Sequence, residues 1–547
     1  MPEDNAFSRI VFPAVCILLL FFQTLEAAPI SKTWEQLQKE GAVIAGIRVE
    51  VQDVFSEDEP ESHYWFAPIA NTLHIETKTR VVERELLFKV GDRVNATLIH
   101  DTERSLGEIL DIARDVLIVP ERVEGKKVWA LVVFKDAWSL STRMNFGLLG
   151  GESKYRFALR EGNLLGLGKG LMINHEKNFD RSFNELRYYD PQLFGGHSRL
   201  IADYQHLSDG ISRFIQLDRP FRTFQTPWAF NLKGGDYDAT LTLYTLSQPV
   251  YDIRHQEQFV RLALAWAYRI SPGGAYRLGV GYMDQETTYS DLEVRQPGLL
   301  PLPDLENRSL SGPLLSWEWF DDRYQNFRNM KSIERTEQYN LGWDVNTGLG
   351  YYSRSTGSTS NGPFFSVSAN KGWLLGSDSL ILINSSIHGR HENGQWRNLF
   401  LTGEATFYNQ SFPLQTLTGY LRLDLALRPD PENWLYLDAL EGLRGYPNHF
   451  LSGDKRWVMS FEERIITNRT LWGLLQVGFA AFLDVGSIHT MAADRWEKTY
   501  ANIGAGLRLG NIRMRIDNVI YFAVTAPLVK GAGSNGLQVV AGNQIRF

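Results

Sequence analysis

Short runs in which apolar residues alternate with small or polar residues recur throughout residues 139–547. Four of the clearest are Val260–Tyr268, Tyr276–Tyr282, Leu421–Leu427 and Leu475–Val485. A period of two places the apolar side chains on one face of a β-strand and the remaining side chains on the other. No strongly amphipathic helix is apparent in this segment. The pattern therefore predicts a mainly β fold made of antiparallel strands.

The periodicity alone fits either a soluble β-sandwich or a membrane β-barrel, and three further features favour the barrel. The runs are about 9 to 11 residues long, enough for a tilted strand to cross a bilayer. Aromatic residues cluster near run ends, as at a membrane interface, and include Trp228, Tyr282, Trp434, Trp457 and Trp472. The third feature is the predicted export of the chain. Sixteen strands would leave about 26 residues per strand and connection, so we predict a 16-stranded transmembrane β-barrel.

The N-terminus predicts export. Ile10–Phe22 is apolar and has the length of a signal-peptide core, too short for a spanning helix. Cleavage after Ala27 would make residues 1–27 a signal peptide, and residues 28–40 would form a linker. The one cysteine, Cys16, lies in the predicted signal peptide, which excludes a disulfide framework and a thiolate metal site.

Residues 41–138 predict a small α+β domain with the element order β-α-α-β-β. Its expected elements are a strand over Val43–Val51, helices over Thr77–Lys89 and Asn95–Ile109, and strands over Asp115–Pro120 and Lys127–Phe134. The outer strands of such a sheet leave an edge to which an extended partner could add a strand.

The chain ends on an alternating run, Leu537–Phe547. The terminal Phe547 on such a strand is similar to the sorting signal of bacterial outer-membrane barrels. An open sheet edge has no hydrogen-bond partner in lipid, so we expect this strand to pair with a first strand near Ser139 and close the barrel. Gly531, Gly533, Gly536 and Gly542 lie in this region and predict a weak seam. The alternative is that these glycines serve only a turn and a bulge.

Several motifs resemble the BamA/TamA-like outer-membrane assembly and translocation superfamily, of the bacterial surface antigen type. Gly442–Tyr446 resembles the Arg-Gly-aromatic tip of the loop that this family folds into its barrel. Ser460–Arg464 and Phe482–Gly486 resemble its S-x-E-x-R and F-x-D-x-G strands, and Asn163–Gly168 its early N-x-x-G-x-G segment. The resemblance implies that residues 41–138 form a single periplasmic POTRA domain and residues 139–547 the outer-membrane barrel.

The residues of these motifs also predict a clamp by their chemistry. Glu462 and Asp484 fall on the inward faces of their strands, where a carboxylate needs water or a partner. Arg444 presents a planar fork of donors that can bridge carboxylates. The predicted loop–barrel clamp consists of Arg444, Gly445, Tyr446, Glu462, Asp484 and Gly486. Gly445 permits a tight turn or close approach, and Gly486 leaves space for Tyr446 or the Arg444 stem. The clamp could serve gating or substrate passage, or it could only stabilise a plugged barrel.

The expected function is the insertion or translocation of polypeptide or lipid clients by a POTRA-barrel machine. Its expected partners are outer-membrane lipid, unfolded or secreted polypeptides bound by the POTRA domain, and periplasmic accessory proteins. The alternative is a passive outer-membrane pore or structural barrel without client handling.

Other function classes find no support in the sequence. A net charge of −7 argues against nucleic-acid binding. No G-x-S-x-G motif is present, and the two histidines of His388–Glu392 fall on opposite faces of a strand. Asp430-Pro431-Glu432 is interpreted as a solvated turn. We therefore expect no enzyme activity, no cofactor and no metal.

Overall fold

The structure, a computed structural model, describes residues 32–54, 74–109, 112–223, 226–271, 273–472, 474–511, 519–531 and 536–543. The predicted signal peptide and Phe547 lie outside these residues. The chain divides into two compact units, Met1–Ala137 and Trp138–Phe547. In the part of the chain that the structure describes, no helix is both long enough and apolar enough to cross a membrane.

The first unit packs three helices against a three-stranded sheet. Its elements are α1 (Trp34–Lys39), β1 (Val43–Gln52), α3 (Thr79–Glu85), α4 (Ala96–Ile109), β2 (Ala113–Glu124) and β3 (Lys127–Asp136). The strand order is β1-β3-β2, with β1 parallel and β2 antiparallel to β3. The helix–strand order predicted for residues 41–138 is present.

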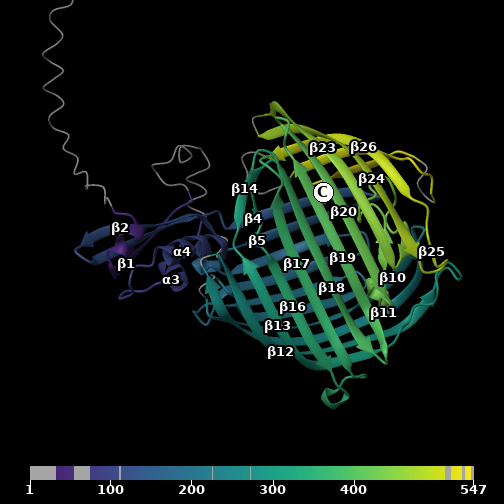
Figure 1. The fold of residues 1–547 in the computed structure, drawn as a ribbon, viewed down its shortest axis with the longest axis horizontal. Coiled ribbons are helices and arrows are strands. Elements are labelled where there is room, and N and C mark those ends of the chain that lie inside the picture. The colour runs from purple at the N-terminus through teal and green to yellow at the C-terminus, as the bar shows by residue number, and fades with distance from the viewer. Residues whose placement is uncertain are drawn as a thin grey trace, which may run out of the picture. The chain divides into compact units, whose positions relative to one another are not determined.

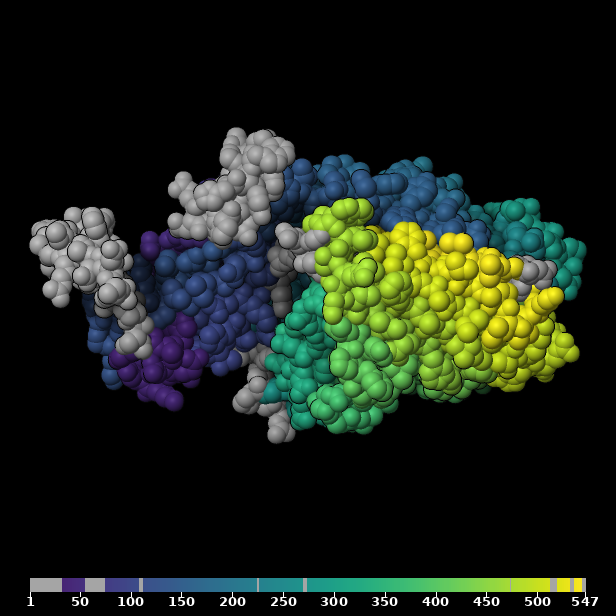
Figure 2. Space-filling view, turned by 90° about the horizontal axis from the view of Figure 1, so that it is seen from above, coloured from purple at the N-terminus to yellow at the C-terminus, as the bar shows by residue number. Residues whose placement is uncertain are grey.

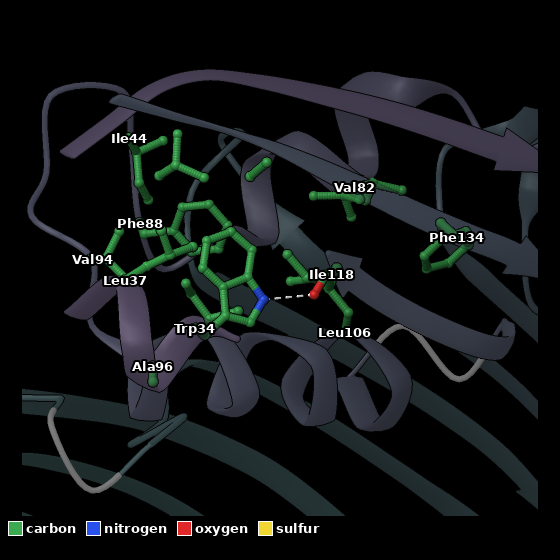
Figure 3. Close-up of a cluster of buried hydrophobic side chains, with 14 of the residues drawn as sticks. Trp34, Leu37, Ile44, Val82, Phe88, Val94, Ala96, Leu106, Ile118 and Phe134 are labelled. Atoms are coloured by element: carbon green, nitrogen blue, oxygen red, sulfur yellow. Dashed lines mark hydrogen bonds between the residues drawn. The ribbon is translucent and has the colours of Figure 1, made fainter. Parts of the chain in front are cut away.

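The predicted linker 28–40 is wrong in part, because α1 belongs to the folded core. Thr33 and Gln36 form a capping box that begins the helix. Trp34 and Leu37 lie three residues apart on one face and are buried with the sheet. The indole N–H of Trp34 donates to the carbonyl oxygen of Ile118 on β2 at 2.8 Å (Figure 3). This bond and the burial of both side chains bind α1 to the sheet.

The second unit is a closed antiparallel β-barrel (Figure 1). Among the described residues its wall contains 20 strands, which are β4 (Leu140–Leu149), β5 (Glu152–Glu161), β6 (Gly170–Lys177), β7 (Ser182–Leu193), β8 (Ser198–Leu207), β9 (Gly210–Arg219), β10 (Trp228–Thr245), β11 (Gln248–Ser271), β12 (Gly274–Val294), β13 (Arg308–Asp321), β16 (Asp344–Tyr352), β17 (Gly362–Leu374), β18 (Ser379–Glu392), β19 (Gln395–Asn409), β20 (Gln415–Leu427), β23 (Lys455–Leu471), β24 (Leu475–Thr490), β26 (Tyr500–Asn511), β27 (Val519–Pro527) and β28 (Gln538–Gly542). The two-residue β25 (Arg495–Trp496) pairs with the end of β24.

The predicted count of 16 strands is therefore wrong, and the reason is the length of the connections. Several neighbouring strands are joined by two-residue turns, such as Leu246-Ser247 between β10 and β11, where both residues have positive φ. Turns of this kind match the twist of antiparallel strands. They leave about 20 residues per strand and connection, so the same length of chain forms more strands than wider spacing allows.

The predicted alternation is confirmed and gives the wall an apolar exterior. On β11 the large apolar side chains Val260, Leu262 and Leu264 are exposed. Exposed apolar side chains occur on most other wall strands as well. Buried polar and charged side chains, by contrast, gather in the interior around a polar cavity. A contiguous apolar exterior of this extent requires a nonaqueous environment.

Aromatic rings form a belt at one rim of this exterior. Ring contacts connect Tyr268 and Tyr276 with Trp317 and Trp319, and continue through Trp343 to Trp373. These residues lie at the end of the wall where β12 begins and β11 and β13 end. Belts of Trp and Tyr are typical of a membrane–water interface.

The barrel closes between its last and first strands, as predicted. In Figure 2 the C-terminal strands, in yellow, lie beside the early strands of the barrel, in blue. Among the described residues, the β28–β4 seam contains the pairs Ala541↔Leu148 and Gly542↔Gly147. The side-chain amide of Asn543 adds a bond to the carbonyl oxygen of Met144 at 3.0 Å.

Candidate functional site: a loop clamped inside the barrel

The site is formed by the long connection between β20 and β23, here called the clamp loop (residues 428–454). It contains a 3-10 turn, η4 (Pro431–Asn433), and two short strands, β21 (Leu435–Leu437) and β22 (Leu451–Gly453), which pair with each other. Leu443, Tyr446 and Phe450 of the loop are completely buried in a cluster with residues of the wall. The loop therefore packs inside the barrel.

Arg444 lies at the centre of this packing, with none of its surface exposed. Its Nε and Nη2 donate to the two carboxylate oxygens of Asp484 on β24, at 2.9 and 2.7 Å. Its Nη1 donates to Oε2 of Glu462 on β23 at 2.6 Å. The sequence predicted that Arg444 contacts Asp484 or Glu462, and it contacts both, in the two-pronged geometry that a guanidinium provides.

Wall residues hold the two carboxylates in place. Asp484 also accepts hydrogen bonds from Ser460 Oγ at 2.7 Å and from Asn502 Nδ2 at 2.8 Å. The second oxygen of Glu462 accepts from Nε of Arg464 at 2.8 Å. Buried charges persist only when they are paired and hydrogen-bonded, and this cluster satisfies both conditions.

The ring of Phe482 lies 3.5 Å from the Arg444 guanidinium carbon, a cation–π contact that sequence reasoning missed. Phe482 lies two residues before Asp484 on β24, so the two side chains share the inward face. The F-x-D spacing was therefore a usable signal for this contact.

The two clamp glycines allow close packing, but one does so differently from the prediction. A Cβ added to Gly445 would lie 2.5 Å from Cβ of Asn502, so only glycine fits there. A Cβ added to Gly486 would meet the carbonyl oxygen of Trp457 at 2.9 Å and Leu437 at 3.1 Å. Gly486 thus makes room for Leu437 of the clamp loop rather than for Tyr446 or the Arg444 stem, because β21 lies over that part of β24.

Tyr446 and Asn448 connect the clamp loop to both sides of the seam region. The Tyr446 hydroxyl lies 2.8 Å from the carbonyl oxygen of Val529, which follows β27, and 2.9 Å from that of Ala501 on β26. The Asn448 amide donates to the carbonyl oxygen of Leu149, at the end of β4, at 3.0 Å. The loop tip therefore holds strand ends on either side of the β28–β4 seam.

The interpretation of Asp430-Pro431-Glu432 as a solvated turn is wrong. Asp430 accepts two hydrogen bonds from Arg390 on β18, at 2.6 and 2.8 Å. Glu432 accepts from Nη2 of Arg308 on β13 at 2.5 Å. These arginines are themselves buried, and only the fold brings them to the base of the clamp loop. The loop is therefore anchored at its base as well as at Arg444.

The two histidines of the His388–Glu392 run pack against aromatic rings. His388 stacks on Phe400 and His391 lies edge-on to Trp396. Over the described ranges, no group of three or more His, Cys, Asp or Glu side chains could hold a metal ion. The early Asn163–Gly168 motif forms a turn in which Oδ1 of Asn163 accepts from the Gly168 N–H at 2.8 Å.

No protein-family model matches the sequence, and no curated protein matches it. Among solved structures, the chain is similar to BamA from Haemophilus ducreyi lacking POTRA domains 1–3, at 14% identity and a TM-score of 0.44, over 92% of this chain and 84% of that one. It is also similar to CdiB from Escherichia coli, at 14% identity and a TM-score of 0.45, over 92% and 76% of the two chains. CdiB from Acinetobacter baumannii is similar at 12% identity and a TM-score of 0.40, over 92% and 73%.

Proposed function

We propose that this protein is an outer-membrane barrel that inserts or translocates polypeptide clients, with the N-terminal unit as its periplasmic docking domain. The observation that carries the proposal is Arg444, buried between Asp484 and Glu462 at the tip of a loop inside the barrel. A loop packed inside the barrel obstructs the flow that a passive pore must allow. A machine that admits clients needs such an element, which closes the barrel at rest.

The wall supports membrane placement. Its exterior is apolar, and its aromatic belt lies at one rim. Only a closed barrel satisfies the backbone groups of β-strands in lipid, and this wall is closed. The signal-peptide pattern of residues 1–27 supports export to an outer membrane.

The seam supports client handling over the passive alternative. Among the described residues, the pairs Ala541↔Leu148 and Gly542↔Gly147 join β28 to β4. Gly536 and Gly542 leave this end of the chain with few side chains that can pack, so we infer that it can separate from β4. A client strand could then pair with the exposed edge, as in β-strand addition. The first unit offers two further sheet edges, on β1 and β2, for extended clients or accessory proteins. This work requires no enzyme activity and no cofactor, since client folding and membrane burial supply the free energy.

The test is depletion of the protein in its native host, followed by quantitative proteomics and lipid analysis of the outer membrane. We expect the loss of particular barrels or of a secreted partner, and plasmid-borne wild-type protein should restore them. The variant Arg444→Ala should restore them less well at equal protein levels. An unchanged outer membrane after depletion would favour the passive barrel.

A further inference from the structure

A second element enters the barrel from the end opposite to the clamp loop. It is the connection between β13 and β16, which forms a hairpin of β14 (Tyr324–Arg328) and β15 (Thr336–Asn340). Because wall strands alternate in direction, this hairpin leaves the wall at the end where β4 begins. The clamp loop leaves it at the other end. The two insertions therefore approach each other along the barrel axis.

The tip of the hairpin is held by its backbone. Four successive carbonyl oxygens each accept a hydrogen bond from a different wall side chain. Arg328 accepts from Gln410 at 2.8 Å and Asn329 from Thr416 at 3.0 Å. Met330 accepts from Arg464 at 2.5 Å and Lys331 from Arg508 at 2.7 Å. We call Gln410, Thr416, Arg464 and Arg508 the carbonyl site.

The hairpin tip packs tightly against glycines of the wall. A Cβ added to Gly510 on β26 would lie 2.4 Å from Cβ of Ile333, and one added to Gly478 on β24 would lie 3.4 Å from its Cδ1. Met330 is buried with Leu380 and Tyr408 of the wall. The tip thus lies against strands from β18 to β26, beyond β13 and β16, where the hairpin begins and ends.

One carboxylate connects the two insertions. Glu462 accepts from Arg444 of the clamp loop through Oε2 and from Arg464 through Oε1. Arg464 in turn holds the carbonyl oxygen of Met330. A cavity of about 710 Å³ lies between the insertions and is lined by Lys331 of the hairpin as well as by Glu441 and Arg444 of the clamp loop.

We propose that the carbonyl site binds the backbone of a polypeptide, and that the hairpin tip occupies it as a removable plug. The donors of the site address consecutive main-chain carbonyls, which every polypeptide presents whatever its sequence. Arg508 is more than nine-tenths buried, and its Nη2 donates to the carbonyl oxygen of Lys331. This inference deepens the proposed function, on which it rests, by assigning a client contact inside the barrel.

The first test uses the purified full-length mature protein in detergent. The ligand is a fluorescein-labelled Gly-Ser-Thr peptide of about 20 residues. In one variant a four-residue Gly-Ser turn replaces residues 322–343, which is feasible because Phe320 and Asp344 are already paired. We expect this variant to bind the peptide at least tenfold more tightly than wild type in fluorescence polarisation. Equal affinities would overturn the proposal.

The second test asks whether the carbonyl site carries that affinity. In the hairpin-replaced background, Thr416→Val and Arg508→Met should each weaken binding about tenfold. Thr406→Val is the matched control, because Thr406 lines the same cavity without bonding to the hairpin. Heat-modifiable gel mobility identifies folded barrels, and only these are compared. Unchanged binding in both site variants would overturn the proposal.

A single substitution provides a variant that keeps the hairpin. A Cβ on residue 510 would lie 2.4 Å from Cβ of Ile333, so Gly510→Ala should displace the tip and raise peptide binding above that of wild type. Binding equal to that of wild type would contradict the plug. Because these assays need no cell, they can fail or succeed independently of the depletion experiment that tests the proposed function.

Discussion

At the residue scale, Arg444 shows how one buried cation can hold a loop. Its fork spans carboxylates on two adjacent strands, and each carboxylate has further donors. Such a cluster adds limited net stability when intact, because desolvation offsets the attraction. Its removal is costly, because the remaining charges stay buried without their partner.

We therefore predict that Arg444→Ala lowers the free energy of unfolding by about 3 kcal/mol, the usual cost of breaking a buried pair. The clamp loop should also become accessible to protease. Denaturant titration of the purified barrel, followed by tryptophan fluorescence, measures the first effect. Arg444→Lys is the matched control, and it should recover only part of the loss because an ammonium lacks the planar fork. Wild-type stability of Arg444→Ala would contradict the clamp.

His100 provides a pH-dependent contact at the residue scale, in the first unit. Its Nδ1 lies 3.1 Å from Glu103, and its Nε2 lies 3.1 Å from Glu35 of α1. Hydrogen bonds to Glu103 and then to Glu35 raise the pKa of His100. The pKa of Glu35 is lowered to about 2, first by its own backbone N–H, then by Thr33 and His100. His100 and Glu35 are both charged at pH values between the lowered pKa of Glu35 and the raised pKa of His100.

The sign of the stability change follows from these shifts. The stabilisation from His100 should be complete below its unfolded pKa of about 6.5 and disappear as pH rises through the higher folded value. That from Glu35 should disappear as pH falls through about 2. The free energy of unfolding, measured by protease susceptibility, should therefore differ between wild type and His100→Gln at pH 5.5. The two values should converge at high pH. The groups are exposed, so 1 M salt should reduce the difference; a difference that grows with pH would refute this.

At the element scale, the seam and the clamp loop act on the same strands. Tyr446 and Asn448 hold strand ends on both sides of the β28–β4 seam. Release of the loop would therefore remove contacts that hold these strand ends beside the seam. Opening of the seam and movement of the loop are expected to occur together.

We predict that a disulfide between Leu148→Cys and Ala541→Cys stops client assembly or export, because these paired residues join β4 to β28. Oxidised and reduced cells are compared for the outer-membrane components lost on depletion. Leu232→Cys with Leu262→Cys, a pair inside the long β10–β11 ladder, is the matched control and should have no effect. Full activity of the oxidised seam variant would exclude lateral opening.

At the scale of the whole molecule, the barrel is an inverted protein, apolar outside and polar inside. Leu262 lies several residues from Tyr268 of the aromatic belt, toward the middle of the apolar band. We predict that Leu262→Arg destabilises the barrel in lipid bilayers by about 2–4 kcal/mol, the cost of a lipid-facing arginine near the midplane. Leu262→Met should have little effect. Equal stability of the two variants in lipid would place this face outside the membrane.

The sequence by itself determined the local pattern and the chemistry of the clamp. Period-two alternation is a property of each strand, so it reveals the barrel class without any tertiary contact. Arg444, Glu462 and Asp484 were recognisable because carboxylates on inward faces need a hydrogen-bond donor, and Arg444 is a strong one. The closure of β28 on β4 followed from the cost of an open edge in lipid.

Only the tertiary structure decided the number of strands, the place of α1 and the second insertion. Strand number depends on turn lengths, which a period-two pattern does not record. The pairs Arg390–Asp430 and Arg464–Met330 join residues far apart in the chain, so no local spacing signals them. The hairpin tip in particular is bound through carbonyl oxygens, which are the same in every residue. A contact made through a carbonyl oxygen does not restrict which side chain that residue carries, and for that physical reason only the fold reveals it.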